Sequence, residues 1–305
     1  MSTPPSGRQF ELCRGEQRAV VVEVGGGIRE YVVGERPVLE SYALQQTCDG
    51  AHGAPLVPWP NRLAEGRYRF AGAEHQLALD EPQKGNAIHG LLRWRPWSEL
   101  ERGVDRVVLG ERLLPMPGYP FAVEVSIAYE LGEEGLAVST TARNIGAVEC
   151  PFGAGQHPYL SPGDGAIDGC TLHLDATTRL INDEHHQVPV GREPVAGTPY
   201  DYRSPKPIGA QQLDDAFTDL GRDTTGLARV RLGCPDGASV ELWADERYAF
   251  LEVFSGDTLA PQRRRRALAV EPMSCAPNAF RSGDGLVRLA PEEELTMRWG
   301  VGLKG

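Results

Sequence analysis

Apolar and polar residues alternate along two neighbouring stretches in the middle of the chain. Residues 121–131 read FAVEVSIAYEL and residues 136–144 read LAVSTTARN, so that a mainly apolar face recurs with a period of two. This period is typical of strands that turn one face to a core and the other to solvent. The segment Glu133-Glu134-Gly135 lies between the two stretches and supplies the residues of a turn. We therefore expect an antiparallel meander, which residues 106–109 extend by one strand.

Similar short runs recur toward both ends of the chain, and turn residues separate them. The chain of 305 residues contains 36 glycines and 24 prolines, which is the punctuation of a protein built from many short strands. No amphipathic segment of about 12 residues favours a helix. The pattern predicts an all-β fold, a large antiparallel two-sheet β-sandwich formed by a single domain, residues 1–305. We expect further strands at residues 18–23, 31–33, 229–232, 239–244, 250–254, 267–271, 286–289 and 294–301, and a surface excursion at residues 181–207.

Composition narrows the classes of function. The net charge of −11 makes nucleic acid an unsuitable partner. Mean hydropathy is −0.33, no run of about 18 apolar residues predicts a membrane span, and the first residues lack the pattern of a secretory signal. We expect a cytoplasmic protein without membrane contact, a monomer or a homodimer. The six cysteines include no CxxC pair, which argues against a disulfide framework or a cysteine-based zinc site.

Residues 58–97 combine the side chains of a polar pocket. The stretch contains Asn61-Arg62, then His89-Gly90, and closes on Trp94 and Trp97. Arg and Asn bond hydroxyl and carbonyl groups, His moves protons, and an indole ring covers the apolar face of a sugar. From residue type alone, we expect Trp94 or Trp243 to form a stacking wall for a neutral hydroxylated ligand.

Other residues have both a functional and a structural interpretation. His157 lies in a segment bounded by Gly and Pro, where functional loops concentrate, although a histidine more often caps a turn or lies bonded in a core. Glu271 follows four apolar residues, so it is either a buried carboxyl with a raised pKa or a strand-end residue turned to solvent. Asp214 and Asp215 form a functional site or an ordinary acidic turn.

Two charged stretches favour the structural interpretation. His185 and His186 are adjacent, and neighbouring residues of an extended chain point in opposite directions, so that they do not share one metal ion. The arginine run at residues 263–266 is expected to be a solvated segment in so acidic a protein.

The order of these residues resembles that of the aldose 1-epimerase family, the mutarotases of the galactose mutarotase superfamily. The resemblance covers nearly the whole chain and rests on five elements: Asn61-Arg62, His89-Gly90, His157, Asp214-x-x-Phe217 and Glu271. It implies a galactose mutarotase-like supersandwich. The chain departs from the best-known galactose mutarotases in two ways. Gln156 precedes the second histidine where those enzymes have Asn, and the aspartate is doubled, so that Asp214 or Asp215 takes the family's role.

The resemblance also implies roles. Glu271 is the general base at the anomeric hydroxyl and His157 the acid at the ring oxygen. His89 and Arg62 hold the ring oxygen and nearby hydroxyls, with Asn61 beside them, and Asp214 orients the sugar. Ring opening by an acid and a base needs no metal and no cofactor, and the sequence offers a site for neither.

Three alternatives remain open at this point. A mutarotase for a hexose 6-phosphate or a sulfonated sugar needs converging basic residues, for which Arg93 and Arg95 are the candidates. Asp214 and Glu271 are also a possible glycosidase pair, which requires a specific carboxylate separation. Finally, the same fold serves a sugar-binding protein without turnover, although binding alone needs neither a strong base nor an acid.

Overall fold

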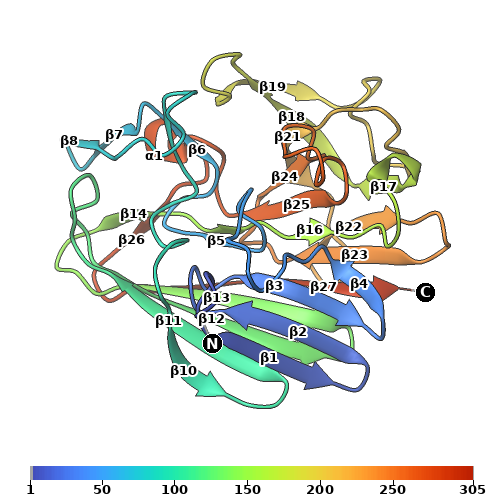
Figure 1. Ribbon diagram of the computed structural model, residues 1–305. Coiled ribbons are helices and arrows are strands. Elements are labelled where there is room, and N and C mark those ends of the chain that lie inside the picture. Colours follow the sequence, from blue (N-terminus) through green and yellow to red (C-terminus); the bar gives the residue numbers. More distant parts are fainter. Residues whose placement is uncertain (1–2, 305) are drawn as a thin grey trace.

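The computed structural model describes residues 3–304, and its regular secondary structure consists almost entirely of antiparallel strands (Figure 1). Two large sheets dominate, and the predicted all-β, two-sheet architecture is confirmed. The first has twelve strands, of which ten form a continuous path and β5 (Pro55–Leu56) and β15 (Gly155–Gln156) branch from it. In spatial order the path is β1 (Gln9–Arg14), β2 (Gln17–Val22), β3 (Ile28–Val33), β4 (Arg36–Leu39), β16 (Tyr159–Leu160), β25 (Leu268–Met273), β24 (Phe250–Phe254), β21 (Asp214–Leu220), β18 (Ala176–Asn182) and β19 (Pro189–Pro194).

The second sheet has nine strands and contains the predicted meander at its centre. In spatial order it is β10 (Ser98–Arg102), β11 (Arg106–Leu113), β12 (Val123–Gly132), β13 (Gly135–Asn144), β27 (Glu294–Lys304), β23 (Ser239–Ala244), β22 (Ala228–Gly233), β17 (Thr171–Leu174) and β20 (Lys206–Pro207). Three two-stranded ribbons complete the fold: β14 (Cys150–Phe152) with β26 (Val287–Leu289), β6 (Arg62–Ala64) with β9 (Asn86–Ile88), and β7 (Arg67–Phe70) with β8 (Ala73–Gln76). The helical elements of the described chain are one 3₁₀ turn (Ile167–Gly169) and α1 (Ala279–Ser282).

The alternation of β12 sets which face enters the core. Val125, Ile127 and Tyr129 are fully buried, whereas the residues between them are only partly covered. The same core cluster contains Leu12 and Val21 from the first sheet, and β1 and β2 contact β12, as their superposition in Figure 1 also shows. Burial of such apolar side chains contributes roughly 1.5–3 kcal/mol each, so the alternating pattern fixes the packing of the two sheets.

The predicted excursion at residues 181–207 is more ordered than expected. It contains the end of β18, all of β19 and β20, and the β18–β19 hairpin, which pairs Leu180 with Arg192. The tip of this hairpin contacts the start of β9, where Asn86 Nδ2 donates a hydrogen bond to the carbonyl oxygen of His186 at 2.9 Å. None of residues 181–207 lines the cavity described next.

Candidate active site

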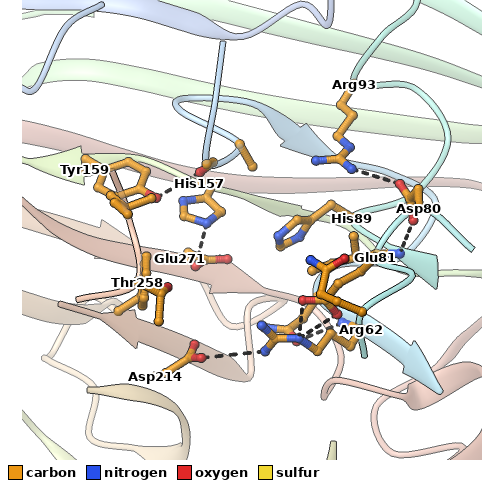
Figure 2. A pocket seen from close by; sticks show the side chains of 17 residues that line it. Arg62, Asp80, Glu81, His89, Arg93, His157, Tyr159, Asp214, Thr258 and Glu271 are labelled. Atoms are coloured by element: carbon orange, nitrogen blue, oxygen red, sulfur yellow. Dashed lines mark hydrogen bonds and ion pairs between the residues drawn. The ribbon is translucent and has the colours of Figure 1, made fainter. Parts of the chain in front are cut away.

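A cavity of about 310 Å³ opens at the middle of the twelve-stranded sheet (Figure 2). Its floor comes from neighbouring strands β21, β24 and β25, and its other walls come from the segments around β6, β9 and β16. The polar lining residues are Asn61, Arg62, Asp80, Glu81, Gln83, His89, Arg93, His157, Tyr159, Asp214, Thr258 and Glu271. Ala51, Ile88, Phe254 and Leu259 add apolar surface. The volume suits one monosaccharide ring with its hydroxyl groups bonded on several sides.

Glu271 lies inside a strand whose six residues are all buried. The sequence allows either a solvent-facing or a buried carboxyl at this position, and the structure shows a buried one, whose side chain is 2% exposed. The apolar sequence of β25 explains this burial, because the strand runs between two others in the centre of the sheet. Burial raises the pKa of Glu271 well above its usual range, with the nearby Asp214 carboxyl adding to the shift and Arg62 opposing it.

His157 is the direct partner of Glu271. It follows β15, and its Nε2 lies 3.1 Å from Glu271 Oε1. The Tyr159 ring stacks on the imidazole with centroids 4.9 Å apart, and the His89 ring meets it edge-on at 5.4 Å. Burial, with a smaller contribution from the nearby Arg93 and Arg62, lowers the pKa of His157 to about 3, although a hydrogen bond to its own backbone opposes the shift. In the unliganded cavity the proton of this pair therefore lies on Glu271.

His89 is held by an unusual backbone. Its φ is +62°, in the left-handed region that few residues other than glycine adopt, and its amide donates to Asn61 O at 2.9 Å. Gly90 follows with φ +73°, and a Cβ there would lie 2.0 Å from Val57 O, so only glycine fits. Asn61 lines the cavity but its Oδ1 already accepts the Arg62 amide at 2.7 Å. Asn61 thus shapes the turn that carries Arg62.

Arg62 links two carboxylates across the cavity (Figure 2). Its Nε donates to Glu81 at 3.0 and 3.2 Å, and its Nη1 lies 3.8 Å from Asp214 Oδ2. Glu81 is fixed in turn by Asn86 Nδ2, which donates to it at 2.7 Å. Charge-assisted bonds of this kind hold the guanidinium in one orientation.

The two aspartates separate by strand alternation. Asp214 and Asp215 are neighbours on β21, so their side chains leave opposite faces of the sheet. Asp214 lines the cavity, whereas Asp215 pairs with Arg179 on the other face, at 2.6–2.7 Å. Of the two aspartates, Asp214 is therefore the residue at the cavity.

Neither predicted tryptophan reaches the cavity, which corrects the expectation of an indole wall. Trp94 is 51% exposed, with the Arg93 guanidinium 5.2 Å from its ring centroid. Trp243 lies on β23, in the other sheet, where its ring covers Gly300 on the neighbouring strand. Residue type suggested a stacking role, but the apolar wall is formed by smaller side chains, Phe254 and Leu259 among them.

Sequence reasoning missed five polar residues of the lining: Asp80, Glu81, Gln83, Tyr159 and Thr258. The acidic pair Asp80-Glu81 was visible within residues 58–97, but its partners were not. Arg93 donates to Asp80 Oδ2 at 2.8 Å, so this arginine, considered only for a phosphate site, is already paired.

The arginine run is also not a wholly solvated segment, which corrects a second expectation. Arg263 is partly buried and bonds Glu40, Asp49 and His52, and Arg265 bonds Asp257 and Asp168. These alternate arginines anchor the loop that brings Thr258 and Leu259 to the cavity.

The described residues show no group of three or more His, Cys, Asp or Glu side chains arranged to hold a metal ion. Within residues 3–304, no helix is long and apolar enough to cross a bilayer.

Comparison with known proteins places the chain among sugar epimerases. The family model described as aldose 1-epimerase matches residues 8–300. The uncharacterized protein YihR of Escherichia coli K12 is 35% identical over 93% of this chain and 89% of its own length. The aldose 1-epimerase of the same organism is 26% identical over 67% of this chain and 60% of its own.

Solved structures support the same fold. The GalM/aldose epimerase homologue of C. elegans superposes with a TM-score of 0.86 at 15% identity, covering 97% of this chain and 98% of that one. At this identity the likeness concerns the fold alone, but the family model spans nearly all of the sequence. The structure is a two-sheet sandwich with a buried Glu–His pair at its cavity, and the family model matches nearly the whole sequence. This chain therefore belongs to the aldose 1-epimerase family.

Proposed function

We propose that this protein is a cofactor-independent mutarotase, which interconverts the α and β anomers of an aldose. The observation that carries the proposal is the buried contact of 3.1 Å between Glu271 and His157 at the wall of a cavity of about 310 Å³. An acid and a base in one small polar cavity are what the opening of a hemiacetal requires.

The reaction moves two protons and leaves the enzyme unchanged. The Glu271 carboxylate takes the proton of the O1 hydroxyl while His157 donates a proton to the ring oxygen O5, and the C1–O5 bond breaks. The open aldehyde rotates about its C1–C2 bond. Closure on the other face reverses both transfers: O1 regains its proton from Glu271, and O5 returns its proton to His157. Each transfer contributes about 10²–10⁴-fold to the rate.

The Glu271–His157 pair carries one proton in both of its useful forms. Opening needs the ion pair, with a carboxylate and an imidazolium. Closure needs the neutral pair, with a carboxylic acid and an imidazole. The raised pKa of Glu271 and the lowered pKa of His157 place the unliganded site in the neutral form, and the 3.1 Å contact is a direct path for the proton between the two. The pair can therefore react with either the closed ring or the open aldehyde.

Other lining residues fit the binding of a sugar. The buried Nδ1 atoms of His89 and His157 have no hydrogen-bond partner within the described chain. Buried polar atoms are normally satisfied, so these atoms mark where substrate groups bind. We assign His89 and Arg62 to hold the ring oxygen and neighbouring hydroxyls, and Asp214 to orient the sugar from the opposite side.

The charge of the cavity favours a neutral sugar over a phosphorylated or sulfonated one. Its two lining arginines are both paired, Arg62 with Glu81 and Arg93 with Asp80. An anionic substituent would have to compete with these carboxylates and would meet Asp214 as well. Glu271 faces a histidine, which supports mutarotation rather than the two-carboxylate chemistry of a glycosidase.

Polarimetry on freshly dissolved α-D-glucose and α-D-galactose tests the proposal. The protein should accelerate the approach to the equilibrium rotation, and Glu271→Gln should abolish the acceleration without loss of folding. Glu241→Gln is the matched control, because Glu241 is also a buried carboxylate but lies in the other sheet. A fully active Glu271→Gln protein would refute the assignment. Acceleration on glucose 6-phosphate alone would refute the neutral substrate but not the chemistry.

A further inference from the structure

A second buried carboxyl lies beside Glu271, and the reaction described above does not use it. Glu252 on β24 is paired directly with Glu271 across the β24–β25 ladder, and it is 2% exposed. Directly paired residues of antiparallel strands project to the same face of the sheet, with Cβ atoms about 4.5–5.5 Å apart. The two carboxyls are therefore neighbours on the face that carries the cavity.

The surroundings of Glu252 do not support a negative charge. It has no ion pair within the described chain, and its Oε2 is buried without a hydrogen-bond partner. An apolar cluster that includes Ala216, Phe250 and Met273 flanks it on the same face. An isolated carboxylate in such a place is strongly disfavoured against the neutral acid.

Most of the charged groups near Glu252 also disfavour its ionised form. Glu271, Asp214 and Asp215 are all acidic, and the nearby Arg62 is held by Glu81. Burial first, and then these carboxyls, raise the pKa of Glu252 well above its usual range, against the opposing effect of Arg62. These effects favour the neutral carboxylic acid, which has one O–H donor.

A buried donor needs an acceptor, and Glu271 offers one. Its Oε1 is held by His157, whereas its Oε2 is buried without a partner. We propose, on the basis of the function proposed above, that Glu252 is a positioning residue of the reaction: it remains a neutral acid and donates its proton in a hydrogen bond to Glu271 Oε2.

This bond would act on the reactive form of the site. Burial alone keeps the proton on Glu271 and so opposes the ion pair with His157 that ring opening needs. A hydrogen bond donated to a carboxylate stabilises the ionised form, and it fixes the rotamer in which Oε1 meets His157. A charged residue at position 252 would repel the Glu271 carboxylate and have the opposite effect.

Three variants separate this role from a structural one. Glu252→Gln keeps an N–H donor at the same place, and we expect its mutarotation rate to stay within about threefold of wild type. Glu252→Leu keeps the volume but removes the donor, and we expect a loss of about 10–100-fold, as for a bond to a charged group. The alkaline limb of its pH–rate profile should also move to higher pH. Glu241→Gln, in the other sheet, should leave the profile unchanged.

Thermal unfolding gives a readout that needs no substrate. Glu252 is neutral in the folded protein but ionised in the unfolded chain above about pH 4.3, so the Tm of Glu252→Gln should rise relative to wild type between pH 5 and pH 8. Glu241 is paired with Arg229 and Arg231, so Glu241→Gln should lower the Tm at pH 7. A Glu252→Gln protein destabilised at pH 7 like Glu241→Gln, or a Glu252→Leu protein with wild-type rate and profile, would overturn the proposal. The unfolding comparison tests the neutral state of Glu252 even if mutarotation itself is not observed.

Discussion

Replacement of Gly90 by alanine tests how the backbone positions His89. An alanine at φ +73° adopts the left-handed conformation, which costs about 1–2 kcal/mol. Its Cβ would also lie 2.0 Å from Val57 O and 2.3 Å from the carbonyl carbon. That oxygen accepts the amides of Leu91 at 2.7 Å and Leu92 at 3.3 Å, so its displacement weakens two hydrogen bonds of about 0.5–1.5 kcal/mol each. Together these terms predict a loss of about 2–5 kcal/mol of stability.

Gly197→Ala is the matched control for this substitution. Gly197 has φ +77°, and an added Cβ there would meet no atom within 4 Å. It therefore carries the conformational cost of about 1–2 kcal/mol alone. At about 2 °C per kcal/mol for a protein of this size, we expect the Tm to fall by about 2–4 °C in the control and by about 4–10 °C in Gly90→Ala.

The catalytic consequence should be larger than the loss of stability. A shift of the chain at Gly90 moves the His89 ring, and a misplacement of about 1 Å commonly lowers a rate by about 10². We expect Gly90→Ala to lower kcat/KM for mutarotation by about that factor at a temperature where it is fully folded, and Gly197→Ala to retain the wild-type value. Equal Tm losses together with wild-type activity in both variants would refute the steric argument.

Three further outcomes follow from the site. The mutarotation rate should fall as pH rises through the raised pKa of Glu271, because the Glu271–His157 pair then loses the proton that O5 requires. It should also fall below about pH 3, where His157 becomes protonated and no base remains. A pH–rate profile checks both limbs, and a rate independent of pH would contradict the shared proton. Trp94→Ala should leave KM within about twofold, since the exposed indole lies outside the cavity. Asp214→Asn should lower kcat/KM by about 10–100-fold. Asp215→Asn should instead lower the Tm, because it weakens the bond to the partly buried Arg179, and leave kcat/KM unchanged. The reverse result would show that the two aspartates have been assigned to the wrong faces.

The alternation of apolar residues determined the fold to a large extent. A period of two over residues 121–131 and 136–144 specifies strands with one buried face, and the structure contains β12 and β13 there, paired from Val123–Asn144 to Gly132–Gly135. The strands β2 and β3 and the strands β22 to β27 were predicted for the same reason. Such patterns are local, so the sequence displays them directly. The order of the strands within each sheet depends on long-range pairing, which no local pattern carries.

In the candidate site, too, the sequence shows the residue types, whereas long-range contacts decide how they are paired. The types and order of its residues, Glu271, His157 and Arg62 among them, were visible in the sequence and in its resemblance to a family. Their partners were not, because Glu81 meets Arg62, and Glu252 meets Glu271, only when separate strands are brought together. The tryptophans were misassigned because residue type does not say which sheet a side chain belongs to. The sequence by itself determined which chemistry is present, and the tertiary structure decided which groups are buried, paired and able to share a proton, since burial and distance are properties of the packed sheets.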